Sequence, residues 1–116
     1  MVSRSSVRTV GVHVLAVYRP NPGGEAALQA EVVAHVPLLR RLGLATDFAS
    51  HVLRAADGTL VEHFEWVSHE AIGAAHQLPD VLAMWQRFDE CATTGPWPTS
   101  PNATTLFPEL EHLGSY

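Results

Sequence analysis

The sequence predicts a single α+β domain in which one sheet carries two helices on one of its faces. Strand-like and helix-like runs follow one another in the order strand, helix, strand, strand, helix, ahead of a proline-rich tail. The dipeptide Asp57-Gly58 separates the two adjacent strand-like runs and is a strong local signal for a hairpin. The length of 116 residues is typical of one domain and suffices for a core without a disulfide or a structural metal.

The first half of the chain is expected to form one strand and one long helix. Residues 10–19 are rich in β-branched side chains and predict the first strand. Residues 20–24 read Pro-Asn-Pro-Gly-Gly, which predicts a loop. Residues 25–42 carry apolar side chains at helical spacing, and Gly43 is a suitable residue to end that helix. Pro37 removes a backbone hydrogen bond, so we expect a kink or a restart of the helix there.

Two strands, at residues 45–55 and 59–67, are expected to pair as the hairpin. A turn of two or four residues around Asp57-Gly58 would make the residue numbers of facing pairs add up to an odd value. One face then carries Asp47, Ala49, His51 and Leu53 together with Leu60, Glu62, Phe64 and Trp66. The other face carries Phe48, Ser50, Val52 and Arg54 together with Val61, His63, Glu65 and Val67.

The second helix is expected to be interrupted. Ser68 is a suitable N-cap, and the helix that it begins should run to about Gln77. Pro79 favours the first position of a new helix, which predicts a break at Gln77-Leu78. Apolar side chains then repeat at helical spacing through residues 81–92.

The chain divides into three parts: a flexible N-terminus at 1–9, a folded domain at 10–94 and a Pro-rich C-terminal extension at 95–116. A fourth strand is expected at 94–97 or at 103–107. The order of elements suggests a split βαβ sheet of the ferredoxin-like kind, with both helices on one face. The opposite face would be bare in a single chain, so we expect a second copy to cover it and the protein to be a homodimer.

Composition and charge exclude several classes of partner. Hydrophobic residues make up 47% of the chain and charged residues 16%, which is typical of a globular protein. The net charge is −5, and the seven basic residues are scattered arginines, so neither nucleic acid nor an anionic membrane surface is an expected partner. The single cysteine, Cys91, and the lack of a convincing signal sequence favour a cytoplasmic location.

The first hairpin face offers a candidate site because it mixes ionisable and aromatic side chains. A histidine beside a carboxylate within apolar walls can transfer protons near neutral pH, which makes His51 and Glu62 candidate catalytic residues. Phe64 and Trp66 would contact the substrate. The competing interpretation is a His–Glu pair that only joins two strands at a wet sheet edge or at a dimer contact.

His76 is a third candidate catalytic residue because it lies two residues before Leu78-Pro79, where the helix is expected to be broken. A broken helix frees backbone groups and often borders a cavity, and Trp85 of the following segment would form a wall. The competing interpretations are a histidine that bonds the last helix carbonyls and a Trp85 that belongs to the core. No spacing of the seven histidines matches a known metal motif, and no cysteine cluster exists, so neither a metal nor another cofactor is expected.

Residues 64–81, with the sequence FEWVSHEAIGAAHQLPDV, resemble the dimeric α/β-barrel superfamily. This group includes antibiotic-biosynthesis monooxygenase-like proteins, small polyketide cyclases, haem-degrading oxygenases and stress-responsive barrel proteins. Trp66 matches the aromatic residue that ends the third strand in the group, and His76 matches the histidine of its Ala-His-x-x-Pro-like helix break. Asp80 stands where the polyketide cyclases place a histidine, which makes it a candidate substrate contact.

The resemblance implies a small-molecule-binding protein that pairs as a dimeric α/β barrel. The expected activity is that of a cofactor-independent monooxygenase or a polyketide cyclase acting on a small aromatic or polyketide-type substrate. His76, His51 and Glu62 would transfer protons, and Trp66, Phe64, Trp85 and Asp80 would bind the substrate. The alternative is a non-catalytic ligand-binding or assembly protein of the same fold.

Overall fold

A computed structural model of the chain describes residues 11–94 and 109–116. The predicted flexible N-terminus and the candidate strand at 103–107 lie outside these residues. The described part contains β1 (Val12–Pro20), α1 (Glu25–Arg41), β2 (His51–Ala55), β3 (Leu60–Trp66), α2 (His69–Ala75), α3 (Pro79–Cys91), β4 (Ala92–Thr94) and β5 (Leu110–Ser115). The chain is therefore an α+β protein, as predicted.

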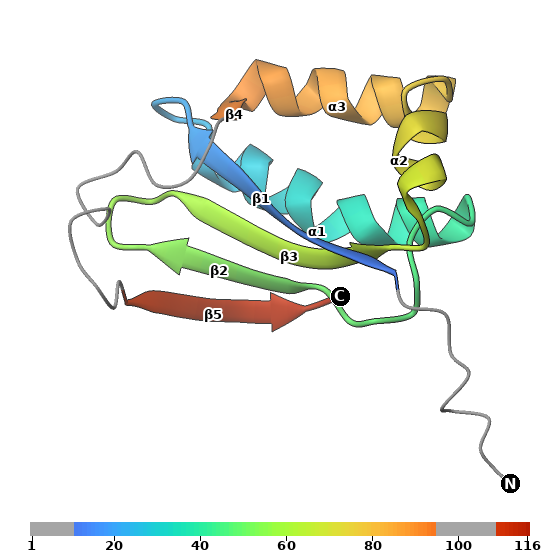
Figure 1. The fold of residues 1–116 in the computed structure, drawn as a ribbon. Helices are drawn as coiled ribbons and strands as arrows, with labels where there is room; N and C mark the ends of the chain where they lie inside the picture. Colours follow the sequence, from blue (N-terminus) through green and yellow to red (C-terminus); the bar gives the residue numbers. More distant parts are fainter. Residues whose placement is uncertain (1–10, 95–108) are drawn as a thin grey trace, which may run out of the picture.

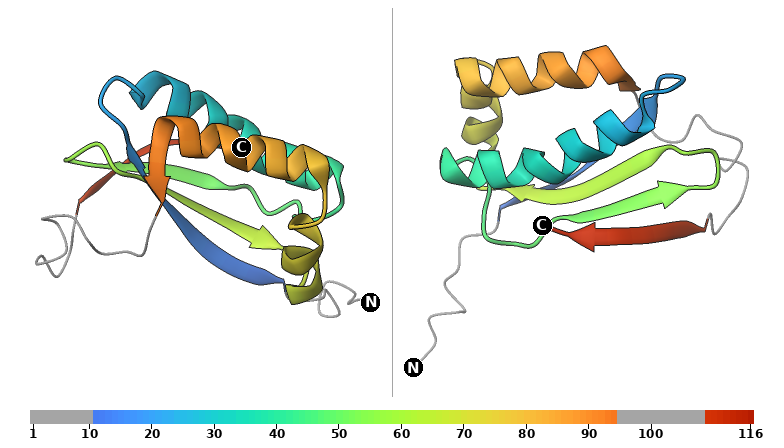
Figure 2. Two further views of the ribbon diagram at one scale, coloured as in Figure 1. Left: turned by 90° about the horizontal axis from the view of Figure 1, so that it is seen from above. Right: turned by 180° about the vertical axis from the view of Figure 1, so that it is seen from behind.

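The strands form one antiparallel sheet in the order β4-β1-β3-β2-β5. Figures 1 and 2 show the long helices α1 and α3 on the same side of this sheet, with α2 at one end. This arrangement is compatible with a ferredoxin-like fold. None of the helices in the described part of the chain is long and apolar enough to cross a membrane.

The predicted break in the second helix is confirmed. The side chain of Ser68 accepts a hydrogen bond from the backbone N–H of Ala71 and caps α2, which ends at Ala75. Leu78 has an extended backbone, and Pro79 begins α3. A proline needs no hydrogen-bond acceptor at the first helical position, so the chain turns there at little cost.

Of the two expectations at Pro37, a kink or a restart, the restart does not occur, because α1 runs through this residue from Glu25 to Arg41. Proline inside a helix removes one hydrogen bond and disfavours helix at the preceding residue. The preceding residue here, Val36, is buried together with Leu39, so packing against the sheet holds the helical backbone on both sides of the proline.

The strand predicted at 45–55 forms only in its second half, as β2. Before it, Ala45 makes an isolated bridge to Trp66, and the backbone N–H of Thr46 bonds the carbonyl of Glu65. The intervening segment leaves the sheet, although its composition is strand-like.

The fourth strand begins earlier than either candidate predicts. β4 follows α3 directly and includes Thr94, the first residue of the candidate at 94–97, whose other residues lie outside the described part of the chain. The sequence analysis missed β5, which adds to the edge of β2 within the predicted extension. The guanidinium of Arg40 and the side chain of Ser50 both donate to the backbone oxygen of Tyr116, which holds the residue after β5 against α1 and the start of β2.

The register predicted for the hairpin is wrong by one residue. His51 faces His63 and Val52 faces Glu62, so the numbers of facing pairs add up to an even value. The cause is a three-residue loop that contains Gly58 at φ 92°, a left-handed conformation that glycine adopts readily. A shift of one residue moves a strand's side chains to the other face. His51 therefore lies on the face opposite Glu62.

Candidate functional site

A pocket of about 480 Å³ lies between the sheet and the helices. Its walls are mostly apolar and aromatic. The lining residues are Val14, Ala16, Tyr18, His35, Phe64, Trp66, Ile72, Trp85, Phe88, Asp89 and Thr94. Three of the predicted substrate contacts, Phe64, Trp66 and Trp85, are among them. A cavity of this size and character is typical of a site for a small organic molecule.

A buried polar cluster lies at the wall of this pocket and is centred on Glu62, whose side chain is 0% exposed. The hydroxyl of Tyr18 donates to Glu62 Oε1 over 2.9 Å. The Nδ1 atom of His35 lies 2.9 Å from the same oxygen. The other carboxylate oxygen, Oε2, is buried and has no hydrogen-bond partner within the described part of the chain.

The partners of His35 define its protonation state. A carboxylate only accepts hydrogen bonds, so Nδ1 of His35 carries the proton and donates a hydrogen bond to Glu62. The indole N–H of Trp85 only donates, and it lies 3.3 Å from Nε2 of His35. Nε2 therefore carries a lone pair, and the imidazole is neutral. This is the tautomer that a general base requires, with Glu62 placed to stabilise the positive charge after proton transfer.

Local sequence patterns place these groups on the pocket side. His35 continues the buried stripe of α1, three residues after Val32 and four before Leu39. Glu62 faces Ala16 of β1 and Val52 of β2 at the middle of the sheet. The helical spacing therefore contained the signal for His35, which the sequence analysis passed over.

Tyr18 acts as a hydrogen-bond donor rather than as an acid in this cluster. Burial raises the pKa of the Tyr18 phenol well above its ordinary value of 10.0, and the adjacent Glu62 carboxylate raises it further. The ring of Tyr18 stacks on Phe88 with the ring centres 4.8 Å apart. The phenol thus stays protonated at neutral pH and holds the carboxylate of Glu62 in place.

The structure does not bring the other predicted site residues together. His76 is exposed, its Nδ1 lies 2.8 Å from the carbonyl of Ile72, and its ring meets Trp85 edge-on at 5.0 Å. Asp80 is exposed in the first turn of α3 and does not line the pocket. His51 lies on the opposite face of the sheet. Of the three predicted catalytic residues, only Glu62 joins the polar cluster.

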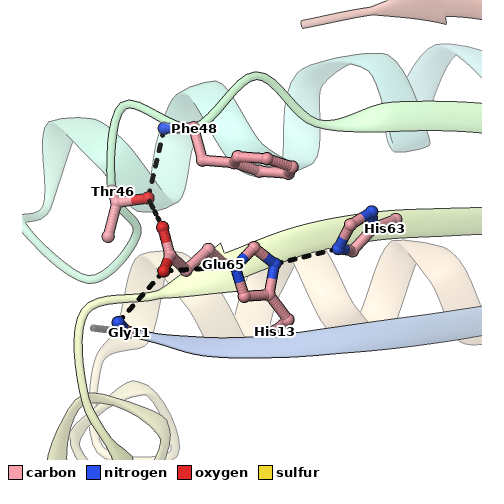
Figure 3. A network of polar contacts seen from close by, with 6 residues as sticks. All are labelled: Gly11, His13, Thr46, Phe48, His63 and Glu65. Carbon is pink, nitrogen blue, oxygen red and sulfur yellow. Dashed lines mark hydrogen bonds and ion pairs between the residues drawn. The ribbon is translucent and has the colours of Figure 1, made fainter.

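The open face of the sheet carries a second polar network (Figure 3). Nδ1 of His13 lies 2.9 Å from Nε2 of His63, and Nε2 of His13 lies 3.3 Å from Glu65 Oε2. The Glu65 side chain is 0% exposed and also accepts hydrogen bonds from the backbone of Gly11 and the hydroxyl of Thr46. The buried carboxylate therefore orients the His13–His63 pair.

The histidines of this face form a row that crosses four strands. The ring centres of His51 and His63 are 6.3 Å apart, and those of His51 and His112 are 5.4 Å apart. Ser115 Oγ lies within 3.4 Å of a nitrogen of both His51 and His112. Within residues 11–94 and 109–116, no group of three or more His, Cys, Asp or Glu is arranged to hold a metal ion.

The row should make the protein less stable in acid. Burial lowers the pKa of His63 below its ordinary value of 6.5, and the charges of His13 and His51 lower it further, although Glu65 opposes the shift. The unfolded chain then binds more protons as the pH falls, so the stabilisation that is present above pH 6.5 is lost as the pH falls through the folded pKa. We expect His63→Gln to make the decrease in unfolding free energy between pH 7.5 and pH 5 shallower in urea titrations.

His69→Gln is the control for this pH dependence because His69 is exposed on α2 and outside the row. It should leave the slope of stability against pH as it is in the unsubstituted protein. An unchanged slope in the His63 variant would contradict the assignment.

No family model, no curated protein and no solved structure matches this chain. Its function is therefore inferred from the residues that line the pocket and from their chemistry.

Proposed function

We propose that the chain is a small-molecule-binding protein whose pocket removes a proton from a small aromatic or polyketide-type substrate. The observation that carries this proposal is His35, a neutral imidazole on the pocket wall with the buried Glu62 behind it. The remaining walls are mostly apolar and aromatic, which suits a flat substrate.

In the proposed reaction, Nε2 of His35 accepts a proton from an acidic O–H or C–H group of the substrate. The imidazolium that forms donates from Nδ1 to Glu62, whose negative charge stabilises it. The electron pair stays on the substrate as a phenolate or enolate. Such an anion can attack a carbonyl to close a ring, or it can react with dioxygen without another cofactor. Both a cyclase and a cofactor-independent monooxygenase would use this first step.

The proposal includes a homodimer of the dimeric α/β-barrel kind, built from split βαβ sheets in the cytoplasm. The strand order β4-β1-β3-β2 supports this arrangement, as does the sheet face that α1 and α3 leave uncovered (Figure 2). Leu15 is 62% exposed and lies opposite His63 on that face. An exposed leucine in the middle of a sheet suits a contact with a second copy.

We expect light scattering to report a dimer at micromolar concentration, and Leu15→Glu to shift it towards the monomer because a charge would enter an apolar contact. Leu82→Glu is the matched control, since Leu82 is also exposed but lies on α3. A folded monomer of the unsubstituted protein would contradict the dimer.

The alternative function is a non-catalytic ligand-binding or assembly protein. One observation favours it: both nitrogens of His35 already have partners, as in a histidine that is only structural. Binding of an aromatic ligand without chemical change, in air and over long incubation, would support this alternative.

Filling the pocket tests either form of the proposal. Ala16 lines the cavity from β1, so Ala16→Phe should occupy part of the 480 Å³ and abolish the ligand-induced rise in melting temperature in an aromatic-metabolite panel. Leu15→Phe is the matched control because the neighbouring side chain points to the other face. Undiminished binding by the Ala16 variant would place the ligand elsewhere.

A further inference from the structure

We propose that the pocket selects ligands that carry a hydroxyl donor, a phenol or an enol. In the free protein, the indole N–H of Trp85 occupies the position that this hydroxyl takes in the complex. The inference rests on the proposed function and names its substrate class. The ligand's O–H would replace the indole N–H at Nε2 of His35, and Trp85 would be a positioning residue rather than a catalytic one.

The selection follows from the fixed tautomer of His35. Because the Nδ1–H of His35 donates its hydrogen bond to Glu62, His35 offers the pocket only the lone pair of Nε2. The Tyr18 hydroxyl likewise donates its hydrogen bond to Glu62. Asp89 and Thr94 also line the pocket, but they are exposed and lie at the ends of α3 and β4. Trp66 and Trp85 are the lining residues that carry indole N–H donors. At Nε2 of His35, the pocket therefore accepts a hydrogen bond.

A ligand without a donor would meet an unfavourable contact at this wall. An ether or ketone oxygen placed against Nε2 would bring two lone pairs together and leave the nitrogen without a partner. A site built around one hydrogen bond discriminates strongly against the analogue that lacks it. We expect a phenol to bind about 10–100-fold more tightly than its methyl ether.

Trp85 has the features of a group that a ligand can displace. Its bond to His35 is 3.3 Å long, at the weak end of the usual range, and its side chain is only half-buried. The ring edge of His76, the exposed cap of α2, packs against its indole. A ligand therefore has only this one long hydrogen bond to replace at Nε2 of His35.

The experiment compares 2-naphthol with 2-methoxynaphthalene by calorimetry, using the unsubstituted protein and Trp85→Phe. The two probes share an aromatic frame and differ in the donor. Trp85→Phe keeps a ring but removes the N–H that competes for Nε2. We expect 2-naphthol to bind the unsubstituted protein more tightly than the ether, and Trp85→Phe to increase this preference further.

The outcomes separate this inference from the proposed function. Equal binding of both probes would overturn donor selection and leave the pocket function standing. No binding of either probe would overturn both. A preference for 2-naphthol that Trp85→Phe leaves unchanged would overturn the role of Trp85. Nitrogen NMR of His35 in the unsubstituted protein adds a test that needs no variant: a proton on Nε2 instead of Nδ1 would overturn the inference.

Discussion

His35→Asn is expected to lower turnover of a substrate about 10²–10⁴-fold, the usual contribution of a positioned general base. Asparagine can still donate from near the position of Nδ1 to Glu62, so the buried carboxylate keeps a partner. It has no nitrogen lone pair at the position of Nε2 and cannot accept the proton. Turnover should be measured per folded molecule, with the folded fraction taken from thermal melts.

His76→Asn is the matched control because it makes the same change at an exposed histidine outside the pocket lining. It should retain most of the activity. A large loss in the His76 variant with an active His35 variant would restore the interpretation drawn from the helix break and contradict the present one. Full turnover in both variants would contradict the assignment of His35 as the general base.

The sequence predicted the broad fold because its signals are local. Pro79 and Ser68 fixed the break in the second helix through their own backbone chemistry. Asp57-Gly58 fixed the hairpin in the same way. What these signals do not contain is the length of the loop, and Gly58 at positive φ extends it to three residues. Because of this one extra loop residue, the prediction put His51 on the same face as Glu62, whereas His51 lies on the other face.

The candidate site was only partly predictable because it depends on contacts between distant elements. Glu62, Phe64, Trp66 and Trp85 were singled out from the chain and do gather around the pocket or its polar cluster. His35 was not, since one polar residue within an apolar helical stripe resembles a tolerated exception until Glu62 is seen 2.9 Å away. β5 was missed for a similar reason: its edge contact with β2 depends on tertiary structure.

The second large effect concerns stability and comes from Glu62. Glu62→Leu is expected to lower the free energy of unfolding by about 2–6 kcal/mol, because it removes the shared acceptor of two buried neutral donors, each of which costs about 1–3 kcal/mol when left unpaired. The Tyr18 hydroxyl and Nδ1 of His35 would both remain buried without a partner. Urea unfolding at neutral pH measures the loss. Glu111→Ala is the matched control, since it removes the carboxylate of an exposed ion pair with Arg54 and should cost about 0–1 kcal/mol.

The triple variant Tyr18→Phe/His35→Leu/Glu62→Leu should recover most of that loss, because it removes the orphaned donors together with their acceptor. Among the described residues, the native cluster leaves Glu62 Oε2 buried without a partner, so its net contribution to stability is small even though each member depends on the others. A triple variant as stable as the unsubstituted protein, but without activity, would show that the cluster is kept for chemistry. If the triple variant were as unstable as Glu62→Leu alone, the loss would come from packing around residue 62 and not from the hydrogen bonds.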